Sequence, residues 1–220
     1  MTGGTGERRR FRRGVPALVT AGLLLAAVFA VARCGRMPRV IVLEDPLTAG
    51  EHIELGVLYE RQGKFDLAIR EYERALRKDK ECFQARVNLG NVWLAKKEYG
   101  KAREEYGEAL AMRPDDPEAT NNLAWTAILS GERREEAAER METVLSREAN
   151  RTATLLDTLG VLRMRMGQPG RAKEAFAEAE RICLEAGGSG CPDEVLKEVR
   201  DHRAEASGDC LPPAAPPLVE

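Results

Sequence analysis

The sequence predicts an all-α fold, a right-handed superhelical solenoid of four helix pairs with a C-terminal capping helix, and three observations lead to this prediction. A set of small and large apolar residues recurs along the chain at intervals of about 34 residues. Charged residues make up 32% of the chain and aromatic residues only 5%, which suits amphipathic helices better than a β-sandwich. Glycines and a proline, among them Gly63, Gly131 and Pro114, stand where such helices would turn or stop.

The recurring unit is most regular in three stretches of the chain. Each has a glycine, an alanine twelve residues later, an aromatic ring four residues further on, and a second alanine three residues after the ring. The glycine and the first alanine leave room for two helices to cross closely, and the ring fills the space between pairs. These positions are Gly56, Ala68, Tyr72 and Ala75, then Gly90, Ala102, Tyr106 and Ala109, then Gly160, Ala172, Phe176 and Ala179.

A fourth, less regular unit lies between the second and the last of these stretches. It has Ala124 in place of the glycine and Met141 in place of the ring, and it runs to about 36 residues. The whole pattern resembles the tetratricopeptide repeat family, with Pro114 at that family's terminal proline. The resemblance implies repeats at 49–82, 83–116, 117–152 and 153–186, each a pair of antiparallel helices that buries its apolar face by stacking on its neighbours.

The N-terminal segment, residues 1–36, predicts a transmembrane anchor or an export signal. Gly14 to Ala32 is a run of nineteen uncharged residues, which as a helix would span roughly 28 Å, close to the thickness of a bilayer core. Five arginines precede it, so we expect the repeats to lie outside the cytoplasm, in a bacterial cell envelope. Three interpretations stay open: an uncleaved single-pass anchor, cleavage after Ala32 to give a periplasmic protein, or acylation at Cys34.

The remainder of the chain is acidic. Residues 1–36 hold seven arginines and one glutamate, which leaves 27 basic and 35 acidic residues in 37–220, a net charge of −8. Nucleic acid would be repelled by such a domain, so no nucleic-acid partner is expected. We expect a lead-in linker at 37–48, a linker and capping helix at 187–206 with the helix starting at Pro192, and a disordered tail at 207–220.

Two cysteines flank the glycine-rich segment ahead of the capping helix. Cys183 and Cys191 form a candidate disulfide, which in an oxidising compartment would tie the cap to the last repeat. The alternative is a packed Cys183 and a surface Cys191.

No catalytic constellation, metal site or cofactor motif is evident. His52 and His202 lie far apart in sequence, and neither has a partner at metal-ligand or relay spacing. Both are interpreted as structural or surface histidines. We therefore expect no enzymatic activity, no cofactor and no small-molecule substrate.

The family resemblance implies that a protein or peptide segment binds a concave groove lined by the first helix of each pair. The residues that it places there are Asn88, Asn91, Asn121, Asn122, Trp125, Ile128, Asp157 and Arg165. One subgroup of the family clamps C-terminal carboxylates with two lysines, two asparagines and an arginine. Asn91 and Asn122 match that clamp, but Val87, Thr154 and Thr158 stand where it needs basic residues. An alternative is that some of the residues placed in the groove pack against the cap or the next repeat.

The sequence therefore predicts a protein-interaction scaffold, anchored at or exported across the cytoplasmic membrane. The alternative is an accessory subunit of an envelope peptidase or of a secretion or assembly system. That alternative rests on residues 45–48 ahead of Leu55-Gly56, which resemble the repeat tail of some bacterial peptidase-like lipoproteins.

Overall fold

The computed structural model describes residues 45–186 and 191–208. The expected anchor or signal at 1–36, most of the lead-in linker, and the chain from residue 209 onward lie outside these residues. The chain divides into two compact units between Pro46 and Leu47, and every helix described below belongs to the second unit. Among the described residues, no helix combines the length and the apolarity needed to cross a membrane.

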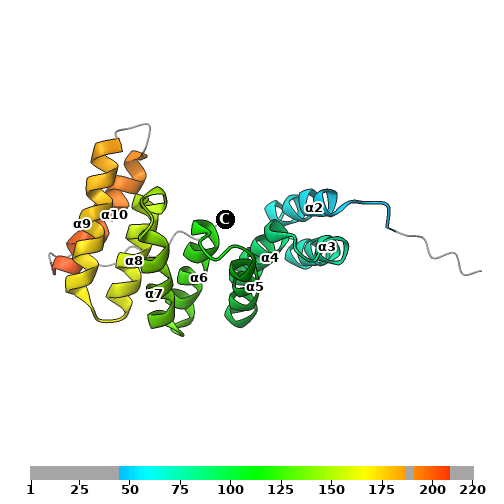
Figure 1. The fold of residues 1–220 in the computed structure, drawn as a ribbon, viewed down its shortest axis with the longest axis horizontal. Coiled ribbons are helices and arrows are strands. Elements are labelled where there is room, and N and C mark those ends of the chain that lie inside the picture. Colours follow the sequence, from blue (N-terminus) through cyan, green and yellow to red (C-terminus); the bar gives the residue numbers. More distant parts are fainter. Residues whose placement is uncertain (1–44, 187–190, 209–220) are drawn as a thin grey trace, which may run out of the picture. The chain divides into compact units, whose positions relative to one another are not determined.

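All regular secondary structure in the described part of the chain is helical, as the repeat pattern predicts (Figure 1). Four helix pairs follow one another, and a last helix closes the series. The elements are α2 (Ala49–Arg61) with α3 (Phe65–Lys78), α4 (Phe83–Ala95) with α5 (Tyr99–Met112), α6 (Pro117–Ser130) with α7 (Arg134–Leu145), the 3₁₀ turn η1 (Glu148–Asn150), α8 (Ala153–Arg165) with α9 (Pro169–Ala186), and α10 (Asp193–Ser207).

Each helix packs against its partner and against the next pair. The second helix of one pair contacts the first helix of the next, as α3 contacts α4 and α5 contacts α6. The first helices also contact one another, because α2 meets α4, α4 meets α6 and α6 meets α8. This stacking of neighbouring units is the arrangement of a helical solenoid.

The crossing inside each regular pair is made by a glycine and a ring. A Cβ atom added to the glycine would lie only 2.3 to 2.5 Å from the Cε1 atom of the ring, far inside the roughly 3.5–4.0 Å of ordinary carbon contact. Any side chain on the first helix would therefore push the ring out of its place. The three pairs are Gly56 with Tyr72, Gly90 with Tyr106, and Gly160 with Phe176, and all three rings are fully buried.

The irregular third pair meets the same packing requirement with other residues. Ala124 stands at the glycine position and Met141 at the ring position, and both are fully buried. A methionine is narrower and more flexible than a ring, so it can pack beside a methyl group. The two departures from the pattern thus compensate for each other.

The turns within the pairs require backbone in the left-handed region. Gly63, Gly131 and Gly167 adopt φ values of 68°, 80° and 71°, which glycine reaches without strain. In the second pair Lys97 takes this role with φ 61°.

The last helix, α10, packs against α9 and α8. Its residue Val199 is fully buried, and Val195 and Leu196 are partly buried against the same core, as the apolar edge of the sequence predicts. Pro192 is the N-cap and the helix begins at Asp193, one residue later than expected. Ser207 belongs to α10, so the helix runs one residue into the range that we expected to be a tail.

Candidate partner-binding site

The first helices of the pairs carry a stripe of partly buried residues beside the fully buried one. On α2 this stripe is Ile53, Val57 and Glu60, which are half-buried and follow helical spacing. The neighbouring stripe of α2, with His52 and Gly56, is fully buried against α3. The half-buried stripe is therefore the one left for a partner.

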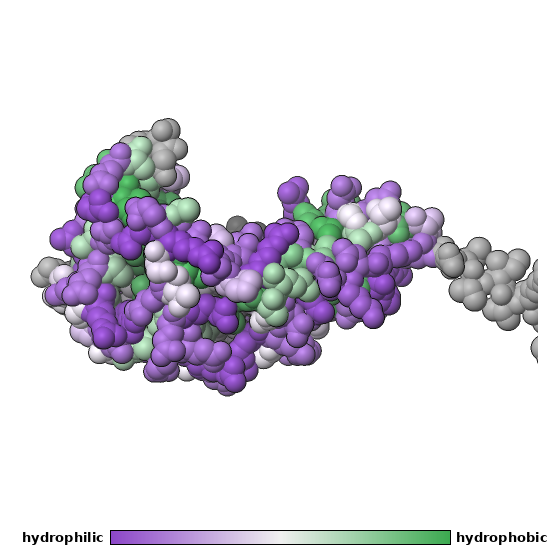
Figure 2. All heavy atoms as spheres, in the orientation of Figure 1, coloured by the Kyte–Doolittle hydropathy of each residue, from purple (hydrophilic) through white to green (hydrophobic). Residues whose placement is uncertain are grey.

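The same positions recur on the following first helices. We call the surface that they form the inner face. It comprises Ile53, Glu54, Val57 and Glu60 of α2, Asn88, Asn91 and Leu94 of α4, Glu118, Asn121, Asn122, Trp125 and Leu129 of α6, and Val161 and Arg165 of α8. Apolar side chains show only in patches on the face seen in Figure 2, which is mostly hydrophilic. Leu129, at 45% exposure, is the most exposed large apolar residue among the members of the inner face.

Two of the predicted asparagines join α4 to α6. Asn122 donates from Nδ2 to Oδ1 of Asn91 at 3.0 Å. The same oxygen accepts the Tyr106 hydroxyl at 2.6 Å. The structure thus brings Asn91 and Asn122 together, and their amides hold two neighbouring repeats in register.

The other two predicted asparagines are less accessible. Asn88 is 8% exposed and accepts from the Gln84 side-chain amide at 2.9 Å. Asn121 is half-buried, and its Oδ1 atom is buried with no hydrogen-bond donor among the described residues. A buried carbonyl oxygen without a donor carries a desolvation cost, so Asn121 offers an acceptor that a ligand could satisfy.

Trp125 and Ile128 lie on the border between the inner face and the core. Trp125 is half-buried and packs against the large apolar cluster that joins α6 to α10. Ile128 is 7% exposed and belongs to that cluster, so its expected place in the groove is wrong. Three residues beyond Trp125, the helix has rotated this position back toward the core.

In the fourth pair, α10 covers one of the predicted residues. Asp157 is 8% exposed and accepts from His202 of α10, with Nδ1 at 2.9 Å from Oδ1. The hydrogen bond to Asp157 raises the pKa of His202, against the opposing effect of burial. Asp157 is thus not free to bind a partner, contrary to the prediction. Arg165 remains exposed at the end of α8.

The contact between α8 and α10 also includes a second carboxylate. Ligand atoms of Asp157, Glu198 and His202 lie within 4.8 Å of one another. Glu198 and His202 are four residues apart and therefore lie on one face of α10. The sequence analysis did not group them with Asp157, because Asp157 precedes Glu198 by 41 residues. The hydrogen bond from His202 accounts for the buried position of Asp157.

Acidic residues on the inner face were missed by the sequence reasoning. Glu54 and Glu118 are exposed, and neither forms an ion pair within the described part of the chain. Glu60 accepts the hydroxyl of Tyr72 at 2.7 Å. Burial raises the pKa of Tyr106, and the charges of Glu60 and Glu118 raise it further. The helical spacing of these glutamates would have identified them, if charges had been counted separately for each face of a helix.

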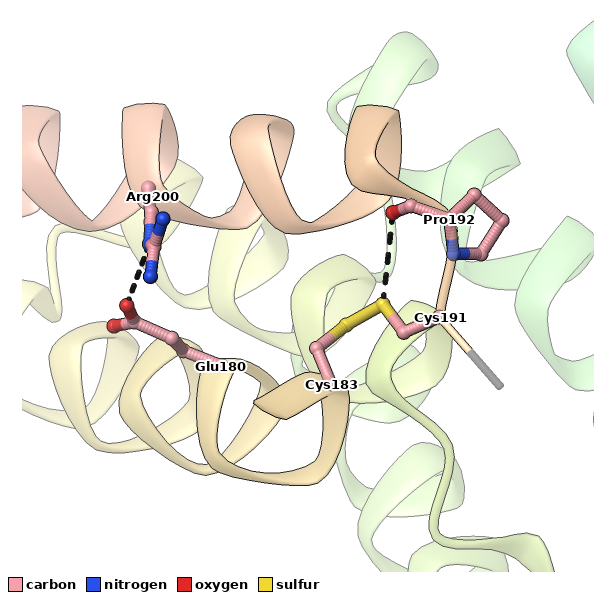
Figure 3. The surroundings of a disulfide bond; sticks show 5 residues. All are labelled: Glu180, Cys183, Cys191, Pro192 and Arg200. Atoms are coloured by element: carbon pink, nitrogen blue, oxygen red, sulfur yellow. Dashed lines mark hydrogen bonds and ion pairs between the residues drawn. A yellow bond between two sulfur atoms is a disulfide. The ribbon is translucent and has the colours of Figure 1, made fainter. Parts of the chain in front are cut away.

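A disulfide joins the end of α9 to the start of α10 (Figure 3). Cys183 and Cys191 are both buried, with Cα atoms 5.0 Å apart. The surface location considered for Cys191 is therefore wrong. Nearby, Arg200 donates to Glu180 at 2.7 Å, and Arg203 pairs with the same carboxylate. The hydrogen bond from Arg200 lowers the pKa of Glu180.

A separate open pocket of about 690 Å³ lies between α3, α4 and α5. Trp93 and Leu89 form part of its wall, and Lys101 sits 4.2 Å from the Trp93 ring centroid. None of the residues predicted for partner binding lines this pocket.

The fold defines a class of protein, a helical-repeat solenoid built of stacked helix pairs. Residues 53–117 match the family model described as tetratricopeptide repeat. The remaining pairs repeat the same glycine–ring or alanine–methionine crossings. Residues 53–117 are therefore tetratricopeptide repeats, and the later helix pairs have the same order of paired helices.

Comparison with a curated protein and with solved structures agrees with this assignment. The chain is 33% identical over 130 residues to the heat-shock protein cognate co-chaperone sgt12 of Aspergillus fumigatus, a match covering 57% of this chain and 36% of that protein. The chain thus spans about a third of the length of that relative.

Two solved structures share the fold. One is PilW, described as a widely conserved type IV pilus biogenesis factor, with a TM-score of 0.55 and 20% identity over 74% of this chain and 87% of that one. The other is the first repeat domain of Spaghetti (RPAP3) bound to the HSP90 peptide SRMEEVD, with a TM-score of 0.50 and 22% identity over 57% of this chain and 98% of that one.

Proposed function

We propose that this protein is an interaction scaffold, kept at the cytoplasmic membrane or exported across it by its N-terminal segment, which binds a protein partner in a groove along the inner face. One observation carries the proposal. Two neighbouring first helices, α4 and α6, present amides beside partly buried apolar side chains, with Asn91 and Asn122 joined across them and Trp125 one turn from Asn122. Such a surface suits an extended segment or a helix with apolar anchors.

The similar proteins support a binding role. One relative is named a co-chaperone, and one similar structure holds a heptapeptide. A carboxylate clamp is not proposed, because Val87, Thr154 and Thr158 supply no cation where that clamp needs one. The likeness to a pilus biogenesis factor favours the second candidate, an accessory subunit of an envelope secretion or assembly system.

The disulfide supports a location outside the cytoplasm. Disulfides form and persist in oxidising compartments such as the bacterial periplasm, and they are rare in the cytosol. The bond between Cys183 and Cys191 therefore fits export of the repeats, which the apolar run from Gly14 to Ala32 also predicts.

The location is tested by fractionation of a tagged full-length chain. We expect the protein in the membrane fraction, or in the periplasm if its signal is cleaved. Recovery in the cytoplasm alone would remove the anchor and the export signal together.

The binding role is tested by a pull-down from solubilised membranes with two tryptophan variants. Trp125→Ala changes the inner face, while Trp93→Ala changes the pocket between α3, α4 and α5 and serves as the matched control. We expect both variants to lose stability and only Trp125→Ala to lose its partner at a temperature where both are folded. Equal partner loss in the two variants would contradict a site on the inner face.

A further inference from the structure

We propose that the inner face binds a cationic segment: a partner whose lysine or arginine side chains, or free amino terminus, enter between α2, α4 and α6 beside apolar anchors. This inference rests on the proposed function and names the chemistry of its partner. The proposed partner is opposite in charge to the peptide SRMEEVD, which is bound by the similar repeat domain.

The inner face offers hydrogen-bond acceptors from its asparagine amides and from its carboxylates. Asn121 presents a buried Oδ1 with no donor among the described residues. Asn122 donates one N–H of its amide to Asn91, and its carbonyl oxygen is a further acceptor on this face. Ionised carboxylates only accept hydrogen bonds, whereas ammonium and guanidinium groups only donate them. The acceptors of the inner face therefore match a partner that is rich in hydrogen-bond donors.

The two first helices that contact α4, the helix of Asn91, each carry acidic residues of the inner face. Glu60 comes from α2 and Glu118 from α6, and the charges of both act on the Tyr106 phenol, whose hydroxyl is bonded to Asn91. Glu60 is fixed by the Tyr72 hydroxyl, so its position does not depend on a partner. A cation bound at α4 would therefore have a carboxylate on each neighbouring first helix.

Three features of the charge distribution also favour a cationic partner. Glu54 and Glu118 are exposed, and neither has an ion-pair partner in the described ranges. The cations of the inner face and its edge, Arg61 and Arg165, lie at the last residues of α2 and α8 and not between the helices. The net charge of −8 in residues 37–220 would also draw a basic partner toward the domain.

Apolar residues on the same face complete the site. Trp125 is half-buried and Leu129 is 45% exposed, one turn apart along α6. A segment that places apolar side chains here can direct its basic residues toward Glu118 and Glu60. An anionic segment would place its charges against the same carboxylates.

The proposal is tested with two labelled heptapeptides and the purified full-length chain in a neutral detergent. One probe is SRMEEVD with a free carboxyl terminus, and the other is SRMKKVK with an amidated terminus. Fluorescence anisotropy at low and high salt measures binding to the wild type and to two charge-matched variants. Glu54→Gln/Glu118→Gln neutralises the inner face, and Glu108→Gln/Glu139→Gln neutralises two exposed acids on α5 and α7 that make no ion pair in the described part of the chain.

We expect the lysine peptide to bind more tightly than the acidic one. The inner-face variant should weaken it by roughly 2- to 30-fold, the range that two exposed charge pairs would give. The α5/α7 variant should change binding by less than about twofold, and high salt should remove the difference between the variants.

Three results would overturn the proposal. The acidic peptide could bind as tightly as the lysine peptide, both variants could weaken binding equally, or neither peptide could bind. In each case the tryptophan pull-down decides separately whether the inner face is the partner site, so the proposed function stands or falls on its own.

Discussion

The crossing of Gly90 with Tyr106 allows a sharp test of how the repeats are packed. A Cβ atom at Gly90 would lie 2.5, 2.8 and 2.9 Å from three atoms of the Tyr106 ring. The ring would have to move by roughly 1 Å to restore ordinary contact. It is fully buried, and its hydroxyl is bonded to Asn91 at 2.6 Å, so it has little freedom to move.

The expected cost of Gly90→Ala follows from two opposing effects. Overpacking a well-packed core costs about 1–3 kcal/mol. Replacing glycine by alanine inside a helix stabilises the folded protein by about 1 kcal/mol. We therefore expect a net loss of up to about 2 kcal/mol, or a fall in Tm of up to roughly 8 °C for a domain of this size.

Gly107 in α5 provides the matched control. It is exposed, and a Cβ atom added there would meet nothing within 4 Å. Gly107→Ala should therefore raise the free energy of unfolding by about 0.5–1 kcal/mol. Thermal and urea unfolding of the two variants, side by side, separates the steric effect from helix propensity.

A double variant tests the compensation observed in the third pair. In a Tyr106→Met background, Gly90→Ala should cost less than in the wild type, because a methionine side chain is narrower and more flexible than a ring. If Gly90→Ala stabilised the protein as Gly107→Ala does, the assigned crossing of α4 and α5 would be refuted.

Three further predictions concern the cap and Trp125. Replacing Cys183 and Cys191 by serine should lower the free energy of unfolding by about 2.5 kcal/mol, from the loop closed by eight residues of separation, and an unchanged urea midpoint under oxidising conditions would contradict a bond that holds α10. Since the pKa of His202 is raised in the folded state, its pair with Asp157 stabilises α10 fully below the ordinary imidazole pKa and is lost as pH rises through the raised value. Hydrogen exchange of α10, corrected for intrinsic rates, should therefore speed up from pH 6 to pH 8 in the wild type but not in His202→Gln; equal pH dependence in both would exclude this pair as the cause. Trp125→Ala should cost about 2 kcal/mol, because the ring is only half-buried against the core, and a melt identical to the wild type would show that the ring makes no core contact.

The repeat register and the helix pairs could be predicted from sequence because they depend on local spacing. A glycine and a ring sixteen residues apart define one helical hairpin, and a single chain shows the pair three times. The compensation of Ala124 by Met141 was visible as two departures from the pattern. Only the structure shows that both residues are fully buried in one core cluster.

The inner face was predicted less completely, for reasons of geometry. Helical spacing places Asn91 and Asn122 on the first helices, but it does not show that their amides bond to each other. Asp157 has the same spacing, yet His202, 45 residues later, covers it. Ile128 lies at the edge of the stripe, where a small rotation decides between groove and core. Glu54 and Glu118 were overlooked because charge was summed along the chain and not by face.

Site-specific photocrosslinking tests the central claim most directly, which is that a partner protein binds the inner face. A photoreactive amino acid is placed at Leu129 on the inner face or at Leu67 on α3, two leucines that are 45% and 36% exposed. The full-length chain is then irradiated in intact cells. We expect a crosslinked partner from position 129 and none from position 67. Crosslinks from position 67 alone, or equal crosslinks from both positions, would contradict the assignment of the inner face as the binding surface.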